Sequence, residues 1–293
     1  MYNNLKIPNQ IILRLNTTKS ILITGCSSGI GYQVAKDLSA RGYQVIATAR
    51  KLEDVERLKQ QGLFSLQLDL EDSESISNAF KNTLEHTDGK LFGLFNNGAY
   101  GQAGALEDLS RAALSKQFET NVIGTMELTN LAIPVMRQNK QGRIIFNSSV
   151  LGFIALKFRG AYTASKYAIE GFADTLRLEL NGTNIYTSLI EPGPIETNFR
   201  ANSYAMYQRH IDRDASVFRD EYLASEKRLL KKGAAVPFTL PASSITPKVI
   251  HALENRAPKA RYYVTKPTYA LGYLKRILGQ CTLDKILLKI SNS

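Results

Sequence analysis

From residue 20 onward, short apolar runs alternate with segments in which apolar residues recur at helical spacing. The runs are short and rich in strand-favouring residues, which is typical of buried strands. Between the first two runs, Ile30, Val34 and Leu38 are spaced to lie on one face of a helix. Strand and helix repeated in this order predict a parallel sheet with helices on both faces. The six expected strands cover residues 20–24, 43–48, 64–69, 91–96, 143–148 and 185–190.

The alternation ends after Pro192-Gly193-Pro194. Residues 199–240 are polar and rich in tyrosine, and we expect them to be irregular. Because loops at the carboxyl ends of parallel strands hold the ligand in such folds, this segment is the expected cover of a substrate. The remaining pattern predicts a helix over residues 246–255, a strand over 262–265 and terminal helices over 269–290.

The pattern therefore predicts an α/β protein with a single doubly wound parallel sheet, a Rossmann fold, and a C-terminal helical appendage that binds substrate. An irregular N-terminal arm is expected over residues 1–18, and the core of the fold over residues 19–198. Residues 199–293 would supply the substrate loop, the last strand and basic C-terminal helices of the same domain.

The composition is that of a soluble globular protein. The chain has 293 residues, of which 44% are hydrophobic and 22% charged, so disordered, fibrous and multi-span membrane classes are disfavoured. The two cysteines, Cys26 and Cys281, provide neither a disulfide framework nor a cysteine-based zinc site, and we expect no metal. No apolar run is long enough to cross a bilayer, and the apolar stretch at residues 11–13 is interrupted at once by Arg14. We therefore expect a cytoplasmic protein.

The net charge of +11 is unevenly distributed. Residues 1–199 hold 20 Lys and Arg against 19 Asp and Glu, whereas residues 200–293 hold 17 against 7, a difference of +10. A basic region of this kind either attracts an anionic partner or is a solvated face. Nucleic-acid binding would rest on charge alone, because no nucleic-acid module is recognisable, and we expect none.

The last 25 residues have a basic amphipathic pattern. Helices of this kind either lie on an anionic membrane surface or pack against the domain or a partner subunit. Peripheral membrane contact is thus one of two open alternatives. The apolar positions are Leu271, Leu274, Ile277, Leu278, Leu283, Ile286, Leu287 and Ile290.

A glycine-rich turn follows the first expected strand and leads directly into a helix. It consists of Thr24-Gly25-Cys26-Ser27-Ser28-Gly29-Ile30-Gly31. The glycines permit a tight turn and a close approach of backbone to a phosphate, and the following helix N-terminus offers free N–H groups to that phosphate. The position of the turn in a strand-helix-strand unit favours a pyrophosphate cradle over a plain tight turn.

The residues after the second strand indicate which dinucleotide binds. NAD sites commonly place an acidic side chain there for the ribose hydroxyls, but this strand is followed by Arg50-Lys51. Two cations suit the 2′-phosphate of NADP(H), which a guanidinium binds with two hydrogen bonds. The alternative is a pair of solvated charges that open a helix. Asp69, at the end of the third strand, is either an adenine contact or part of a helix cap before Ser73.

Tyr162 and Lys166 are four residues apart in an expected helix, which places both side chains on one face. The same spacing occurs at Tyr2/Lys6, Tyr32/Lys36 and Tyr262/Lys266, but only Tyr162 has a serine, Ser149, 13 residues earlier and directly after a predicted strand. A free tyrosine has a pKa of about 10, which a nearby ammonium would lower. The pair is therefore suited to proton transfer during the reduction of a carbonyl.

These motifs together resemble the short-chain dehydrogenase/reductase family, in the branch marked by TGxxxGxG, NNAG, a serine before YxxxK, and a later PG. The resemblance covers residues 20–265, with one departure, since Gly98-Ala99 reverses the usual Ala-Gly. Within the family the chain is similar to bacterial aldehyde reductases and to 17β-hydroxysteroid and retinol dehydrogenases. The resemblance implies an NADP(H)-dependent oxidoreductase, most directly a carbonyl reductase, for a hydrophobic aldehyde, retinoid or steroid-like substrate.

The resemblance also implies a role for each matching residue. Tyr162 would donate the proton, and Lys166 would lower the pKa of Tyr162 and hydrogen-bond the nicotinamide ribose. Ser149 would polarise the substrate oxygen, and Asn121 would hold a water in a proton relay that ends at Lys166. Cofactor contacts are implied for Gly25, Ser27, Ser28, Gly29, Ile30, Gly31, Arg50, Lys51, Asp69, Asn97, Tyr162, Lys166, Pro192, Ile195 and Thr197.

The substrate-facing side chains are the least defined part of the site. Apolar residues between 150 and 158, with Phe199, Tyr204 and Tyr207, are expected either to line an apolar pocket or to belong to the core or a subunit interface. The family's habit of pairing long helices implies a homodimer or homotetramer. The alternative function is a non-catalytic NADP(H) sensor or scaffold, a role usually marked by loss of the tyrosine or lysine, and both are present here.

Overall fold

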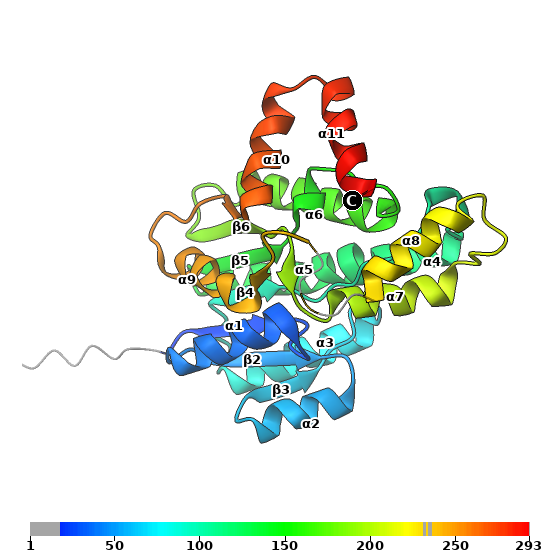
Figure 1. Cartoon of the computed structure of the whole chain (residues 1–293). Helices are drawn as coiled ribbons and strands as arrows, with labels where there is room; N and C mark the ends of the chain where they lie inside the picture. The colour runs from blue at the N-terminus through cyan, green and yellow to red at the C-terminus, as the bar shows by residue number, and fades with distance from the viewer. Residues whose placement is uncertain (1–17, 231–232, 234–235, 293) are drawn as a thin grey trace, which may run out of the picture.

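The computed structural model describes residues 18–230, 233 and 236–292. In these residues, seven parallel strands form one sheet in the order β3-β2-β1-β4-β5-β6-β9 (Figure 1). The predicted doubly wound α/β sheet is confirmed, whereas the arm predicted over residues 1–18 lies outside the described residues except for Thr18. The strands are β1 (Ser20–Ile23), β2 (Gln44–Ala49), β3 (Phe64–Gln67), β4 (Gly93–Asn96), β5 (Gly142–Asn147), β6 (Ile185–Glu191) and β9 (Arg261–Tyr263).

Helices cover both faces of this sheet. One face carries α1 (Gly29–Ala40), α2 (Leu52–Gln60) and α9 (Thr246–Glu254), and the other carries α3 (Ser73–His86), α5 (Gly124–Gln138) and α6 (Gly160–Glu179). A further helix, α4 (Arg111–Phe118), leads through a π-helical turn (Glu119–Ile123) into α5. The chain adds strands in one direction from β1 to β3 and in the other direction from β4 onward, so the order of the strands reverses between β1 and β4. The carboxyl ends of these two strands form the switch point at which such folds bind ligands.

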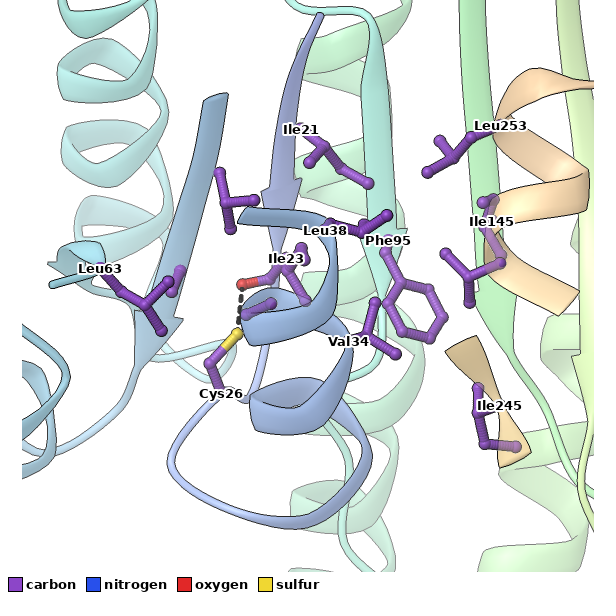
Figure 2. Packing of buried hydrophobic residues seen from close by; sticks show 14 of the residues in the cluster. Ile21, Ile23, Cys26, Val34, Leu38, Leu63, Phe95, Ile145, Ile245 and Leu253 are labelled. Carbon is purple, nitrogen blue, oxygen red and sulfur yellow. Dashed lines mark hydrogen bonds between the residues drawn. The ribbon is translucent and has the colours of Figure 1, made fainter. Parts of the chain in front are cut away.

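The strands are continuous apolar runs because both of their faces are buried. In β1, Ile21 and Ile23 pack with α1, while Leu22 joins the core on the opposite face of the sheet. Figure 2 shows the first of these clusters, in which Cys26 also lies. The Cys26 thiol donates a hydrogen bond to the Ile23 carbonyl oxygen at 3.3 Å, and burial raises its pKa to about 12. Cys26 is therefore a core residue rather than a reactive thiol.

The segment predicted to be irregular, residues 199–240, instead contains two helices, α7 (Phe199–His210) and α8 (Arg219–Leu230). Their packing depends on a few aromatic side chains, chiefly Tyr207 and Tyr222, whose rings contact each other with centroids 5.3 Å apart. The Tyr222 hydroxyl accepts a hydrogen bond from the Ala105 backbone N–H at 2.7 Å. The prediction was wrong because these helices obtain their burial from tertiary contacts of tyrosine rather than from an apolar stripe visible in the sequence.

The C-terminal helices α10 (Lys266–Ile277) and α11 (Gln280–Asn292) project together from the rest of the fold (Figure 1). Leu271, Leu283 and Leu287 are buried against Ile154, so much of the predicted apolar stripe packs against the domain. Of the two alternatives for this tail, packing against the domain is therefore the one that the structure shows. Among the described residues, no helix is both long and apolar enough to span a bilayer.

Candidate active site

The glycine-rich turn between β1 and α1 has the geometry expected of a phosphate cradle. Gly25 and Gly29 adopt the left-handed region, with φ of 69° and 61°. A Cβ on Gly31 would lie 2.4 Å from the Gly25 carbonyl oxygen, so only glycine fits there. The α1 N-terminus has neither a side-chain cap nor an acidic residue in its first turn, which leaves its backbone N–H groups and the positive end of the helix dipole available to an anion.

Asn97, directly after β4, hydrogen-bonds the glycine-rich turn that follows the neighbouring strand β1. Its amide nitrogen donates to the carbonyl oxygens of Thr24 and Gly25 at 2.9 and 3.1 Å. The Thr24 hydroxyl oxygen accepts from the backbone N–H groups of Asn97 and Gly98 at 2.9 and 2.8 Å. The two loops are thus joined by reciprocal hydrogen bonds.

Asn147, the last residue of β5, extends this network to the lysine. Its amide nitrogen donates to Asn97 Oδ1 at 2.9 Å, and its backbone carbonyl accepts from Lys166 Nζ at 2.6 Å. A continuous path of hydrogen bonds therefore connects the glycine-rich turn with Lys166. The sequence analysis missed Asn147, although a polar residue at the end of a strand beside Ser148-Ser149 was an available signal.

Tyr162 and Lys166 lie one turn apart on α6, as predicted, and both are almost fully buried, with 8% and 4% exposure. Lys166 Nζ is 5.6 Å from the centre of the Tyr162 ring. Ser149 follows β5, caps a 3₁₀ turn by accepting a hydrogen bond from the Leu151 N–H, and hydrogen-bonds the Tyr162 hydroxyl. The structure thus brings Ser149, Tyr162 and Lys166 together.

Burial controls the electrostatics of this group. It raises the pKa of Tyr162, and the hydrogen bond with Ser149 only partly opposes the shift. Burial also lowers the pKa of Lys166 to about 8, against the opposing charge of Glu170. The pKa of Tyr162 is therefore shifted in the direction opposite to the lowering expected from Lys166, because removal of the phenol from water disfavours its charged form.

Asn121 lies in the π-helical turn between α4 and α5, a feature frequent at functional sites. Its Oδ1 accepts from the Tyr100 N–H at 3.1 Å, and its Nδ2 donates to the Tyr100 carbonyl at 2.9 Å and to Ser165 Oγ at 3.0 Å. Ser165 Oγ in turn donates to the Tyr162 carbonyl at 2.7 Å. The side-chain amide of Asn121 thus holds α6 in place through its hydrogen bond to Ser165, and none of these hydrogen bonds reaches Lys166.

The two cations expected at a 2′-phosphate follow β2, and a further cation that the sequence analysis missed contacts the glycine-rich turn. Arg50 and Lys51 are exposed after β2, and Ser27 and Ser28 are half-buried in the turn. Arg57, on α2, donates from Nη2 to the Ser27 carbonyl at 2.6 Å. Arg57 is therefore a cation in contact with the glycine-rich turn, at a helical position that no sequence motif singled out.

Asp69 does not cap the helix that follows it. Asp72 does so, since its carboxylate accepts from the N–H groups of Glu74 and Ser75 at 2.9 and 3.3 Å. Asp69 instead accepts from the Glu71 N–H at 3.1 Å, and its backbone N–H donates to Ser75 Oγ at 3.0 Å. The capping alternative was wrong, because the chain continues beyond β3 before α3 begins.

The remaining predicted cofactor contacts lie around the same turn. Thr197 faces the turn closely enough that a Cβ on Gly29 would be 3.0 Å from its side chain. Ile30 and Ile195 pack against the core beneath the cradle. The Pro192 carbonyl accepts a hydrogen bond from the Val150 N–H at 2.8 Å, which links the segment after β6 to the segment that carries Ser149.

The apolar residues expected around the substrate separate into two clusters. Val150, Phe153, Ile154 and Leu156 pack with α10 and α11, while Phe158, Tyr204 and Tyr207 pack with α7 and α8. Phe199, the first residue of α7, contacts the Tyr162 ring at a centroid distance of 5.2 Å. Helix α7 therefore begins directly over the tyrosine. The described residues contain no group of three or more His, Cys, Asp or Glu arranged to hold a metal.

A dinucleotide cradle connected to a buried Tyr-Lys pair is the arrangement of a nicotinamide-dependent oxidoreductase. The chain belongs to the short-chain dehydrogenase family, whose model matches residues 19–208. It is 42% identical over 269 residues to the uncharacterized oxidoreductase YbbO of Escherichia coli, with 92% of this chain and 94% of that protein covered. It is 37% identical over 226 residues to human retinol dehydrogenase 8, with 72% and 71% covered.

The fold is shared with solved structures of the same family. A short-chain dehydrogenase/reductase from Burkholderia phymatum in complex with NAD superposes with a TM-score of 0.74 at 24% identity, covering 89% of this chain and 92% of that chain. The protein is thus an oxidoreductase whose Rossmann fold is of the kind that binds NAD(P).

Proposed function

We propose that the protein is an NADP(H)-dependent carbonyl reductase for hydrophobic aldehydes or ketones, including retinoid or steroid-like compounds. The observation that carries this proposal is the meeting of Ser149, Tyr162 and Lys166 at one end of a hydrogen-bonded path from the glycine-rich turn. The similarity to human retinol dehydrogenase 8 supports an apolar substrate. So do the apolar clusters on either side of Tyr162.

The roles proposed for the residues follow from their environment. The nicotinamide cofactor, when bound, supplies the hydride to the carbonyl carbon. Ser149 donates a hydrogen bond to the carbonyl oxygen, and Tyr162 transfers its hydroxyl proton to the alkoxide that develops there. Lys166 holds the nicotinamide ribose and, when protonated, stabilises the phenolate left on Tyr162. Gly25, Ser27, Ser28, Gly29 and Gly31 hold the pyrophosphate side.

Asp69, Asn97, Pro192, Ile195 and Thr197 are proposed to complete the cofactor site around the adenine and nicotinamide, and Ile30 to pack beneath the pyrophosphate. Asn121 is proposed to position the catalytic helix and to hold the water of the relay to Lys166. The proposal that Asn121 positions α6 is supported by its hydrogen bond to Ser165.

The proposal is tested by measuring the oxidation of NADPH by the purified protein with medium-chain aldehydes, retinal and keto-steroids. We expect turnover with at least one of these classes. Tight NADPH binding without turnover on any of them would favour the alternative, a non-catalytic sensor or scaffold. Failure to bind both NADPH and NADH would contradict the reductase and the sensor alike.

Preference for NADPH is proposed because Arg50 and Lys51 follow β2 without an acidic residue, and because Arg57 adds a third cation beside Ser27. Replacing Arg50 with aspartate is expected to lower kcat/KM for NADPH by about tenfold to a hundredfold, since a charge-assisted hydrogen bond contributes about 1.5–3 kcal/mol. The same change is expected to leave kcat/KM for NADH unchanged or higher. Steady-state kinetics with both nucleotides checks this.

Arg137→Asp is the matched control for that charge reversal. Arg137 is exposed in the last turn of α5. Because crossover helices run antiparallel to the strands, this turn lies at the amino-terminal ends of the strands, away from the cofactor site at their carboxyl ends. Arg137→Asp should leave the ratio of the two kcat/KM values unaltered. Equal loss with NADPH and NADH in Arg50→Asp would contradict the 2′-phosphate assignment.

We also propose that the protein assembles as a homodimer or homotetramer through α6. The outward face of this helix exposes Phe172 and Leu178, at 42% and 68%, next to Gly171, whose added Cβ would meet no atom within 4 Å. An arginine at this glycine would therefore leave the protomer undisturbed and block a second helix. Light scattering is expected to give the mass of two or four chains for the native protein and of one chain for Gly171→Arg.

Gly279→Arg, which also adds a side chain into open space but between α10 and α11, should keep the native mass. A monomeric native protein, or an assembly that only Gly279→Arg disrupts, would overturn the assignment of the interface to α6.

A further inference from the structure

Two glutamates lie buried behind the catalytic helix and have no part in the roles described so far. Glu170 is on α6, one turn after Lys166, and Glu191 is the last residue of β6. Their exposed fractions are 8% and 0%. We call Glu170 and Glu191 the acid pair.

The two carboxyl groups have unequal partners. Glu170 Oε1 accepts a hydrogen bond from Ser148 Oγ, and Oε2 accepts from Arg261 Nη2 at 3.1 Å. Neither oxygen of Glu191 accepts a well-aligned hydrogen bond from the described residues; Glu191 has an ion pair from Arg261 Nε to its Oε1 at 3.2 Å, and its carboxyl group lies beside that of Glu170. Two donors favour a carboxylate on Glu170, whereas the environment of Glu191 favours a neutral carboxylic acid.

In the described part of the chain, Arg261 is the cation that contacts both carboxyl groups of the acid pair. Arg261, on β9, also donates to Asp174 of α6 at 2.7 Å, so one guanidinium already faces two other carboxylates. Arg177, one turn further along α6, forms an ion pair with Asp174. From α10, Arg276 lies close enough to Tyr263 for its charge to oppose the rise in the pKa of that tyrosine.

The pKa shifts of the two glutamates agree with the assignment of the neutral form to Glu191. Burial, reinforced by the charge of Glu170, raises the pKa of Glu191 to about 9, against the opposing charge of Arg261. Burial also raises the pKa of Glu170, but the hydrogen bond from Ser148 and the charge of Arg261 oppose that shift. The next cation along α6 is Lys166, whose pKa is lowered by burial and raised by Glu170.

We propose that Glu170 and Glu191 share one proton, which resides on Glu191, and that the single charge retained on Glu170 keeps Lys166 protonated and anchors the Ser148-Ser149 turn. The two glutamates are positioning residues, since neither touches the reacting atoms. The catalytic meaning of the inference rests on the proposed function, but the location of the proton and its effect on Lys166 do not.

The arrangement explains why a carboxylate is tolerated so close to the core. With both groups ionised, two negative charges would share one guanidinium that also faces Asp174, which is unfavourable in a buried site. With one proton retained, Glu191 can donate a hydrogen bond to Glu170. The remaining charge then opposes the effect of burial on Lys166 in the pH range in which the ammonium is required.

Infrared spectroscopy of the cofactor-free protein at neutral pH tests the location of the proton. We expect the C=O stretching band of a protonated carboxylic acid in the native protein and in Asp174→Asn, and its loss in Glu191→Gln. Absence of the band from the native protein would overturn the proposal. Glu191→Gln replaces a neutral acid with a neutral amide of the same shape, so its thermal unfolding midpoint should stay near that of the native protein.

The effect on Lys166 is tested by nuclear magnetic resonance of protein labelled with ¹³C at the lysine Cε, with the Lys166 signal assigned by its absence in Lys166→Arg. We expect the Lys166 titration midpoint in Glu191→Gln to match that of the native protein. In Glu170→Gln/Glu191→Gln, which differs by one charge, the midpoint should be lower by about one pH unit. Asp174→Asn removes a charge from the same helix, further from Lys166, and should leave the midpoint in place.

An equal shift in Glu191→Gln would place the charge on Glu191, and an unchanged midpoint in the double variant would remove Glu170 from the control of Lys166; either result overturns the proposal. If the double variant does not fold, the infrared band still decides where the proton resides, and a lowered Lys166 midpoint in Glu191→Gln would still overturn the proposal. Neither measurement needs turnover, so failure of the proposed reductase function would be recognised separately.

Discussion

Replacement of Tyr162 with phenylalanine is expected to lower kcat for carbonyl reduction by about a thousandfold or more while the affinity for NADPH changes little. The substitution removes only the hydroxyl that hydrogen-bonds Ser149 and keeps the ring that packs on Phe199. General acid catalysis contributes about 10² to 10⁴ in rate, and no other hydroxyl on α6 takes the place of this one. Stopped-flow measurement of NADPH oxidation, with NADPH binding followed by fluorescence, separates the two quantities.

Tyr167→Phe is the matched control, because Tyr167 lies on the same helix and its hydroxyl accepts a hydrogen bond from Lys275 on the surface. It should retain native kcat. If Tyr162→Phe retained more than about a tenth of the native rate, Tyr162 would not be the proton donor, although the fold and the family would stand.

Adding one methyl group at Gly31 is expected to cause the second largest loss. The Cβ of Gly31→Ala would lie 2.4 Å from the Gly25 carbonyl oxygen and 2.5 Å from Asn97 Nδ2, and the nearer of these atoms is backbone, so the turn itself must shift. We expect the free energy of unfolding to fall by about 2 kcal/mol, as for other overpacked sites. NADPH affinity should fall at least about tenfold, because the hydrogen bond from Asn97 to Gly25 is displaced together with the cradle.

Gly98→Ala adds the same methyl group in the same cradle but against side chains. Its Cβ would lie 3.0 Å from Leu70 Cδ1 and 3.2 Å from Thr24 Oγ1, which can yield by a few tenths of an ångström. Thermal unfolding and NADPH titration should show a small effect for Gly98→Ala and a large one for Gly31→Ala. Equal effects would mean that the clash with the Gly25 carbonyl does not control the cradle.

Much of the site could be predicted because its residues are local to motifs. Tyr162 and Lys166 share a helix, and Gly25, Gly29 and Gly31 share a turn, so the chain itself holds each set together. Residues that join the sets across the fold were harder to find. Asn147 and Arg57 contact the site through elements distant in sequence. The position of Asn147 beside Ser148-Ser149 was the only signal for it, and no motif or spacing distinguishes Arg57 from a surface residue.

The tertiary structure also changed the chemistry expected of the residues that the sequence analysis proposed for the site. The sequence shows that an ammonium lies near a phenol, but it does not show how much water surrounds them. Burial of Tyr162 raises its pKa, which is opposite to the direction expected from the sequence. The same dependence on burial distinguishes Glu191 from Glu170, two acidic residues that the sequence alone gives no reason to treat differently.

By itself, the sequence determined the parallel sheet, the glycine-rich turn, the Tyr-Lys pair and the family, because each depends on short-range periodicity or on residues close together in the chain. The two helices within residues 199–240 and the packing of the C-terminal apolar stripe against the domain were seen only in the three-dimensional structure. The same is true of the contact of Glu170 and Glu191 with Arg261. These features arise from contacts between distant segments, where tyrosine burial and the desolvation of charge outweigh local preference.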